Sequence, residues 1–84
     1  MSSAAGDLEA RVRGLLELCF GAAPGEISAA TVQDDVAGWD SVGHLNLMLM
    51  IEETFGVRLE IDDMQRLTSV GAILCFLGEA EAKR

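Results

Sequence analysis

Proline, aromatic residues and histidine are scarce in this chain. Its 84 residues include one proline, one tryptophan, three phenylalanines and one histidine, whereas half of the residues are hydrophobic. A chain of this length can bury one modest hydrophobic core but not two. The composition therefore predicts one all-α domain, built as a small helical bundle.

Cysteine is rare as well. Cys19 and Cys75 are far apart in the sequence, and each lies within an apolar helical pattern, so we expect two reduced cysteines packed as small hydrophobic side chains. A metal site would need more ligands at closer spacing. The pair Asp34 and Asp35 does not supply a calcium loop, because such a loop needs further oxygen ligands at alternate positions. No metal site is expected.

Long hydrophobic runs are missing. No segment approaches the roughly 18 uninterrupted apolar residues of a membrane-spanning helix. The first 13 residues, MSSAAGDLEARVR, have no basic start followed by an apolar block, so they do not form a signal peptide. We expect a cytoplasmic protein without membrane insertion.

Basic residues are few. Six bases stand against 14 acids, and the net charge is −8. From Asp34 to Asp63 there are eight acids and one base, Arg58. The negative electrostatic potential of this acidic segment repels nucleic acid and anionic membranes, and it attracts basic protein surfaces toward the middle of the chain. The charge alone is equally compatible with an acidic surface that has no specific partner.

The most informative segment is residues 38–55, GWDSVGHLNLMLMIEETF. Asp40 and Ser41 are both good N-cap residues, so the segment predicts a helix that begins there, with its positive dipole end beside the serine hydroxyl. One helical face is a core stripe of His44, Leu47, Met48, Ile51 and Phe55. A second face, which we interpret as a partner surface continued by Glu52 and Glu53, consists of Val42, Leu45 and Leu49.

Three further helices are predicted. The first is capped by Asp7, ends at Gly21 and buries Leu8, Val12, Leu15, Leu16 and Cys19. A long connection, residues 21–38, could be pinned to the bundle by Ile27, Val32 and Val36, and Trp39 is expected to anchor its end. After an extended link with Val57, Leu59 and Ile61, a short helix spans about residues 62–67. Thr68 or Ser69 then caps a last helix, which buries Val70, Ile73, Leu74 and Leu77 and is followed from Glu79 by a solvated tail. The ordered core is expected at about residues 7–78, between flexible termini.

These motifs resemble the acyl carrier protein family. The resemblance rests on Asp40-Ser41-Val42, the apolar helix, the segment 52–57 (EETFGV) and the late segment 67–71 (LTSVG), and it spans Leu8 to Leu77. It implies a four-helix bundle with three longer helices, a short third helix and a long first loop. It also implies that Ser41 carries 4′-phosphopantetheine, derived from coenzyme A, whose thiol holds acyl or aminoacyl groups as thioesters.

The resemblance further implies a non-catalytic monomer that serves other enzymes. These partners are a phosphopantetheinyl transferase, an acyl- or aminoacyl-loading enzyme, a synthase and downstream modifying enzymes. They would recognise the middle helix through Asp40, Val42, Leu45, Leu49, Glu52 and Glu53. Catalysis by Ser41 with His44 as base is disfavoured, because His44 lies on the core stripe and no nucleophile motif surrounds the serine.

The chain departs from the pattern of fatty-acid synthesis carriers. Those proteins usually carry acids at the positions of Gly43 and Asn46 and a leucine at the position of Val42. The Trp39-Asp40-Ser41 form is similar to discrete carriers of polyketide, nonribosomal or related specialised pathways. A carrier for general fatty acid synthesis remains the alternative, and an unmodified helical adaptor is the alternative from another class. Whether the domain was cut from a larger synthase stays open.

Overall fold

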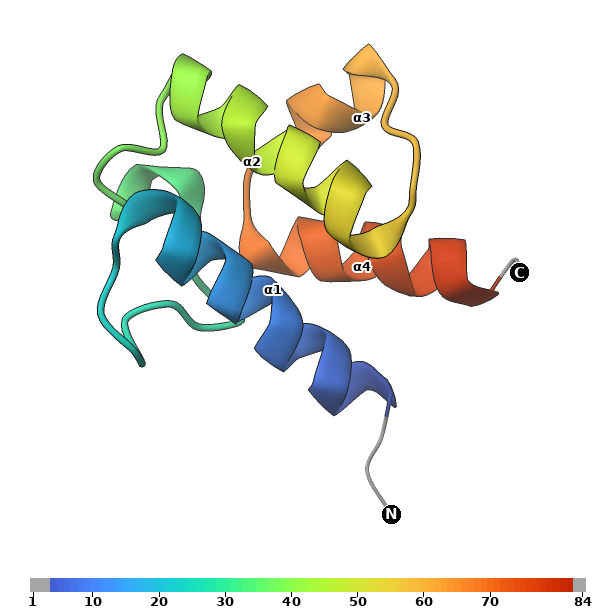
Figure 1. Cartoon of the computed structure of the whole chain (residues 1–84), viewed down its shortest axis with the longest axis horizontal. Coiled ribbons are helices and arrows are strands. Elements are labelled where there is room, and N and C mark those ends of the chain that lie inside the picture. Colours follow the sequence, from blue (N-terminus) through green and yellow to red (C-terminus); the bar gives the residue numbers. More distant parts are fainter. Residues whose placement is uncertain (1–3, 83–84) are drawn as a thin grey trace.

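The computed structural model describes residues 4–82 and shows an all-α fold (Figure 1). Its elements are α1 (Ala4–Phe20), the 3₁₀-helix η1 (Gln33–Asp35), α2 (Ser41–Phe55), α3 (Ile61–Arg66) and α4 (Val70–Ala82). This is the predicted arrangement of three longer helices, a short third helix and a long first loop. No helix of residues 4–82 is long and apolar enough to cross a bilayer.

The bundle is built around α1, which packs against both α2 and α4. In Figure 1 the start of α2 and the long loop lie at the left, whereas the start of α1 lies at the bottom and the end of α4 at the right. The short α3 touches α2 through a contact of His44 with the backbone of Met64. The start of α2 is therefore presented at the end of the molecule away from the start of α1 and the end of α4 (Figure 1).

The two faces predicted for α2 are confirmed. Leu47, Met48 and Ile51 are fully buried, while His44 and Phe55 are half-buried at the edges of the core. The opposite line is open, with side chains exposed by 70% at Val42, 52% at Leu45 and 51% at Leu49. The single core that the chain length allows covers only one face of this apolar helix.

The helix ends differ from the predicted ends in two places. Asp7 does not cap α1, which begins at Ala4 and includes Asp7 in its first turn. At the other end, α4 continues past Gly78 to Ala82, because the good helix formers in its last turn offset the cost of one glycine. Ser69 rather than Thr68 caps α4, since its Oγ accepts from the N–H of Ala72 at 3.0 Å. The predicted flexibility at residues 1–3 and 83–84 lies outside the described residues.

The long loop is pinned mainly through its backbone. Ile27 and Trp39 are buried as predicted, and Val36 is half-buried, but the Val32 side chain is exposed. At Val32 the backbone forms an isolated antiparallel bridge with Ser69. The N–H of Gln33 donates to Thr68 O, and the N–H of Val70 donates to Thr31 O, each at 2.9 Å. Val32 therefore pins the loop to the bundle as predicted, but through its main chain and not through its side chain.

The interpretation of both cysteines as packed side chains is half right. Cys19 is half-buried, and burial raises the pKa of its thiol. Cys75 is exposed. It lies two residues from the buried Ile73 and Leu77, and a two-residue step turns the helix by about 200°, toward solvent.

Candidate functional site

The turn that enters α2 places a serine at the first helical position. Asp40 is the N-cap, with extended backbone dihedral angles, and its Oδ1 accepts from the N–H of Gly43 at 2.9 Å. The first helical hydrogen bond follows, from His44 N–H to Asp40 O at 2.7 Å. Of the two predicted cap residues, the structure thus selects Asp40. Ser41 is left free of any capping role, and its side chain is exposed.

The surroundings of the Ser41 hydroxyl favour a phosphate. The N–H groups of Ser41 and Val42 belong to the first turn of α2 and have no intrahelical acceptor. They lie at the positive end of the dipole of a 15-residue helix. A phosphodiester on the serine oxygen would meet these donors in open solvent, as anions at helix N-termini commonly do. The residues present therefore fit a phosphate-linked group on Ser41.

An aromatic cluster holds the turn in place. The Trp39 ring is only 4% exposed and stacks on Phe20 of α1, with ring centroids 5.5 Å apart. It also lies nearly parallel to the His44 ring at 6.1 Å. Gln33 Nε2 donates to the Trp39 carbonyl oxygen at 2.9 Å. Trp39 is therefore the predicted anchor of the loop, and its burial leaves little surface for contact with a partner.

His44 is not placed to act as a base for Ser41. Its Nδ1 accepts from the Trp39 Nε1–H at 2.8 Å. Its Nε2 lies 2.5 Å from the Met64 carbonyl oxygen, which can only accept, so the ring is the neutral Nε2–H tautomer. Both ring nitrogens are thus occupied away from the serine. This geometry removes the one acid–base partner that the sequence offered for nucleophilic catalysis.

Gly43 is required by close packing of the loop on α2. A Cβ at this position would collide with the Gly38 carbonyl oxygen and would lie 2.9 Å from Cε1 of Phe20. Gly38 itself has φ of 90°, a conformation that glycine adopts readily. The absence of an acid at position 43 therefore has a steric cause in this chain. Of the two positions at which fatty-acid carriers usually have acids, only Asn46 is exposed.

The predicted recognition residues do not all face solvent alike. Asp40, Val42, Leu45, Leu49 and Glu53 are exposed. Glu52 is half-buried instead, and its Oε2 accepts from the Leu59 N–H at 2.8 Å, which secures the link to α3. The sequence interpretation missed Ile61, the first residue of α3, which is 71% exposed. Its alternation with Val57 and Leu59 suggested a place in the extended link. The local signal for a helix start was Asp63, whose Oδ2 accepts from the Glu60 N–H at 3.0 Å.

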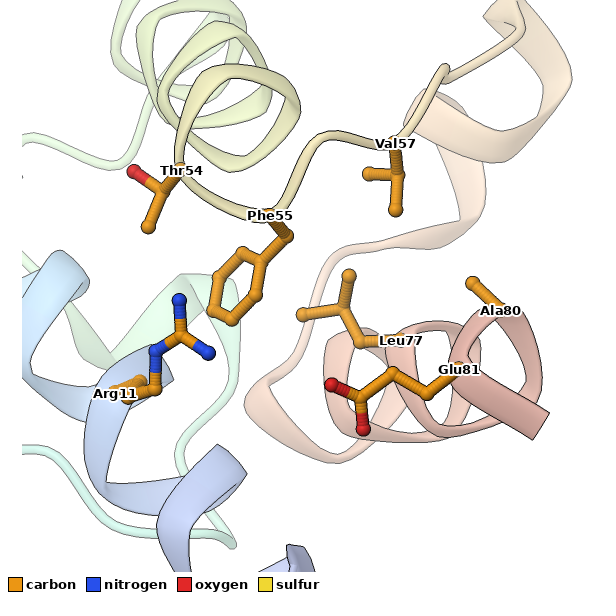
Figure 2. A pocket seen from close by; sticks show the side chains of 7 residues that line it. All are labelled: Arg11, Thr54, Phe55, Val57, Leu77, Ala80 and Glu81. Atoms are coloured by element: carbon orange, nitrogen blue, oxygen red, sulfur yellow. The ribbon is translucent and has the colours of Figure 1, made fainter. Parts of the chain in front are cut away.

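A cavity of about 210 Å³ opens at the other end of α2 (Figure 2). The Arg11 guanidinium lies over the Phe55 ring, 4.4 Å from its centroid, and Val57 and Leu77 approach from the other side. Phe55 is 14 residues from Ser41, or about 21 Å along the helix axis at 1.5 Å per residue. This cavity is therefore separate from the serine turn.

The fold and the exposed serine at the start of α2 together define a carrier-type helical bundle. The family model described as the phosphopantetheine attachment site matches residues 10–77, and the chain belongs to this family, that of the acyl carrier proteins. Its members carry a covalently attached 4′-phosphopantetheine and are generally non-catalytic, working with phosphopantetheinyl transferases and synthase enzymes. A search of curated proteins found no match.

Proposed function

We propose that Ser41 is the attachment point of 4′-phosphopantetheine and that the chain presents acyl or aminoacyl cargo to separate enzymes. The observation that carries this proposal is the exposed hydroxyl of Ser41 at the first position of α2, directly after the Asp40 cap. When bound, the group supplies a thiol that holds the cargo as a thioester.

The protein's own residues have two tasks in this function. Asp40, Trp39 and Gly43 hold the turn, so that the serine oxygen projects from a fixed position. Val42, Leu45 and Leu49 form an exposed apolar line next to it, which we call the docking face, and Glu53 adds negative charge at its far end. A partner enzyme that fits this surface has an apolar contact patch with basic residues at its rim.

The test is the intact mass after incubation with coenzyme A and a broad-specificity phosphopantetheinyl transferase. Wild type should gain one phosphopantetheine group, and Ser41→Ala should gain none. The variant should fold normally, because Asp40 provides the cap and alanine is a good helix former. Ser28→Ala, at an exposed loop serine, is the control and should be modified like wild type. A wild type that stays unmodified would favour the unmodified adaptor.

We further propose a specialised pathway, polyketide, nonribosomal or related, over general fatty acid synthesis. The support is the neutral, exposed Asn46 beside the docking face, where fatty-acid carriers usually have an acid. If charge is the discriminating feature, Asn46→Glu should raise the rate of transfer by fatty-acid synthesis enzymes several-fold, chiefly through faster association. An unchanged rate, with wild type already a good substrate of those enzymes, would favour the general fatty-acid role.

A further inference from the structure

The short helix α3 depends on contacts from outside itself. It has six residues, and helices of that length are not stable alone. At its start the Glu60 N–H donates to Asp63 Oδ2 at 3.0 Å, and at its end the N–H of Leu67 reaches Asp63 O at 3.1 Å. The helix ends at Arg66, so the carbonyl of Met64 is one of the terminal acceptors without a helical donor. His44 Nε2–H supplies that donor.

His44 also belongs to a closed set of contacts among three segments. Its Nδ1 joins α2 to the long loop through Trp39, and its Nε2 joins α2 to α3 through Met64. A third hydrogen bond, from the Gln33 N–H to Thr68 O, connects the long loop to the segment that follows α3. Histidine suits this place because the neutral ring has one acceptor and one donor nitrogen on opposite sides.

We propose that His44 is a positioning residue that holds α3 and the Trp39 loop on either side of the Ser41 turn, so that partner enzymes meet α2 and α3 as one rigid surface. This inference rests on the proposed function. Both helices contribute exposed apolar side chains, Val42 and Leu45 from α2 and Ile61 from α3. Release of α3 displaces Ile61 but leaves Ser41 on an intact α2. Loss of the hydrogen bond between His44 and Met64 should therefore weaken the docking of partner enzymes without slowing the chemical step.

Two substitutions separate the two hydrogen bonds. The amide of asparagine reaches about as far as Nδ1, so His44→Asn can keep the bond to Trp39 but loses the bond to Met64. Glutamine reaches about as far as Nε2, so His44→Gln can keep the bond to Met64 but loses the bond to Trp39. The measurements are amide hydrogen exchange at Met64 and Leu67, the NMR signal of the Trp39 indole N–H, and steady-state kinetics of Ser41 modification.

We expect faster exchange in α3 for His44→Asn and near-normal exchange for His44→Gln. Both variants lose the ring beside Trp39, so the indole N–H signal should shift in each, but only His44→Gln should also show the loss of its hydrogen bond. The transferase KM for His44→Asn should rise about two- to tenfold, as one lost hydrogen bond allows, with kcat nearly unchanged. Equal α3 exchange in the two variants, or a loss confined to kcat, overturns the inference.

The wild-type protein provides a test that needs no variant. Nitrogen-15 chemical shifts should show that His44 Nδ1 carries no proton and that Nε2 is protonated. The opposite tautomer would refute the inference that His44 joins α3 to the long loop. A wild type that accepts no phosphopantetheine would refute the proposed function alone. The exchange and tautomer measurements would then still decide whether His44 joins α3 to the loop.

Discussion

At the scale of the residue, Gly43 shows how a missing side chain can serve the site. The carbonyl of Gly38 and the ring of Phe20 occupy the space that a Cβ would need. The loop can therefore approach the first turn of α2 closely enough for Trp39 to stack between Phe20 and His44. The small residue is part of how the Ser41 turn is held.

Gly43→Ala should accordingly destabilise the fold by about 1–3 kcal/mol, the usual cost of overpacking a close contact. Gly14→Ala is the matched control, because Gly14 also lies within a helix but has open space where its Cβ would be. That substitution should stabilise by about 0.5–1 kcal/mol, since alanine is the better helix residue. Chemical denaturation of both variants gives the comparison, and a Gly43→Ala protein as stable as Gly14→Ala would contradict the packing argument.

At the scale of the element, α2 combines a buried face with an exposed one. Ile51 is fully buried, whereas Leu49, two residues earlier, is half exposed. Apolar residues on the exposed face contribute little to folding, because their area is not removed from water. The docking face can thus be altered without disturbing the core.

Leu49→Glu and Leu45→Arg should therefore impair loading or transfer while the melting temperature stays close to that of wild type. Ile51→Ala should instead cost about 2–5 kcal/mol, as deletions of large buried side chains do. Thermal melts together with the rate of Ser41 modification separate the two effects. Unfolding of Leu49→Glu would show that the two faces have been assigned the wrong way round.

At the scale of the whole molecule, negative charge is concentrated and poorly compensated. The chain has 14 acids and six bases, and residues 34–63 contain eight of the acids but only one base, Arg58. Among the described residues the ion pairs are Arg13 with Glu9 and Arg66 with Asp63, at 3.4 and 3.3 Å. Exposed pairs of this kind contribute about 0–1 kcal/mol each. Repulsion should therefore dominate the surface.

Moderate salt or millimolar magnesium should raise the melting temperature. The molecule is small, with principal extents of 33, 30 and 19 Å. We therefore expect many of its acids to lie within one Debye length of each other, which is about 10 Å at 0.1 M salt. Acids at helix starts, such as Asp40 and Asp62, gain from the dipole, whereas Glu53 is exposed in the last turn of α2. Glu53→Gln should thus stabilise the free protein slightly and slow its association with a basic partner. A wild-type melting temperature that falls with added salt would refute this account.

The sequence by itself determined the helices, the buried stripe and the candidate serine. These features follow from short-range rules. The 3.6-residue period places Leu47, Met48 and Ile51 on the buried face, and Asp40, a preferred N-cap residue, directly precedes Ser41. Gly56 ends α2 in the left-handed conformation, with φ of 66°, as expected of a glycine after an apolar helix. The resemblance to carrier proteins then supplied the role of the serine.

Only the tertiary structure decided what the turn rests on. His44 meets Met64, 20 residues away in sequence, and Gly43 meets Phe20, 23 residues away. No periodicity records such contacts, because they depend on how separate segments cross in space. For the same reason the sequence could not show that Val32 holds the loop through its backbone rather than through its side chain. Local pattern set which side chains face inward, and the packing of distant segments set which of them meet.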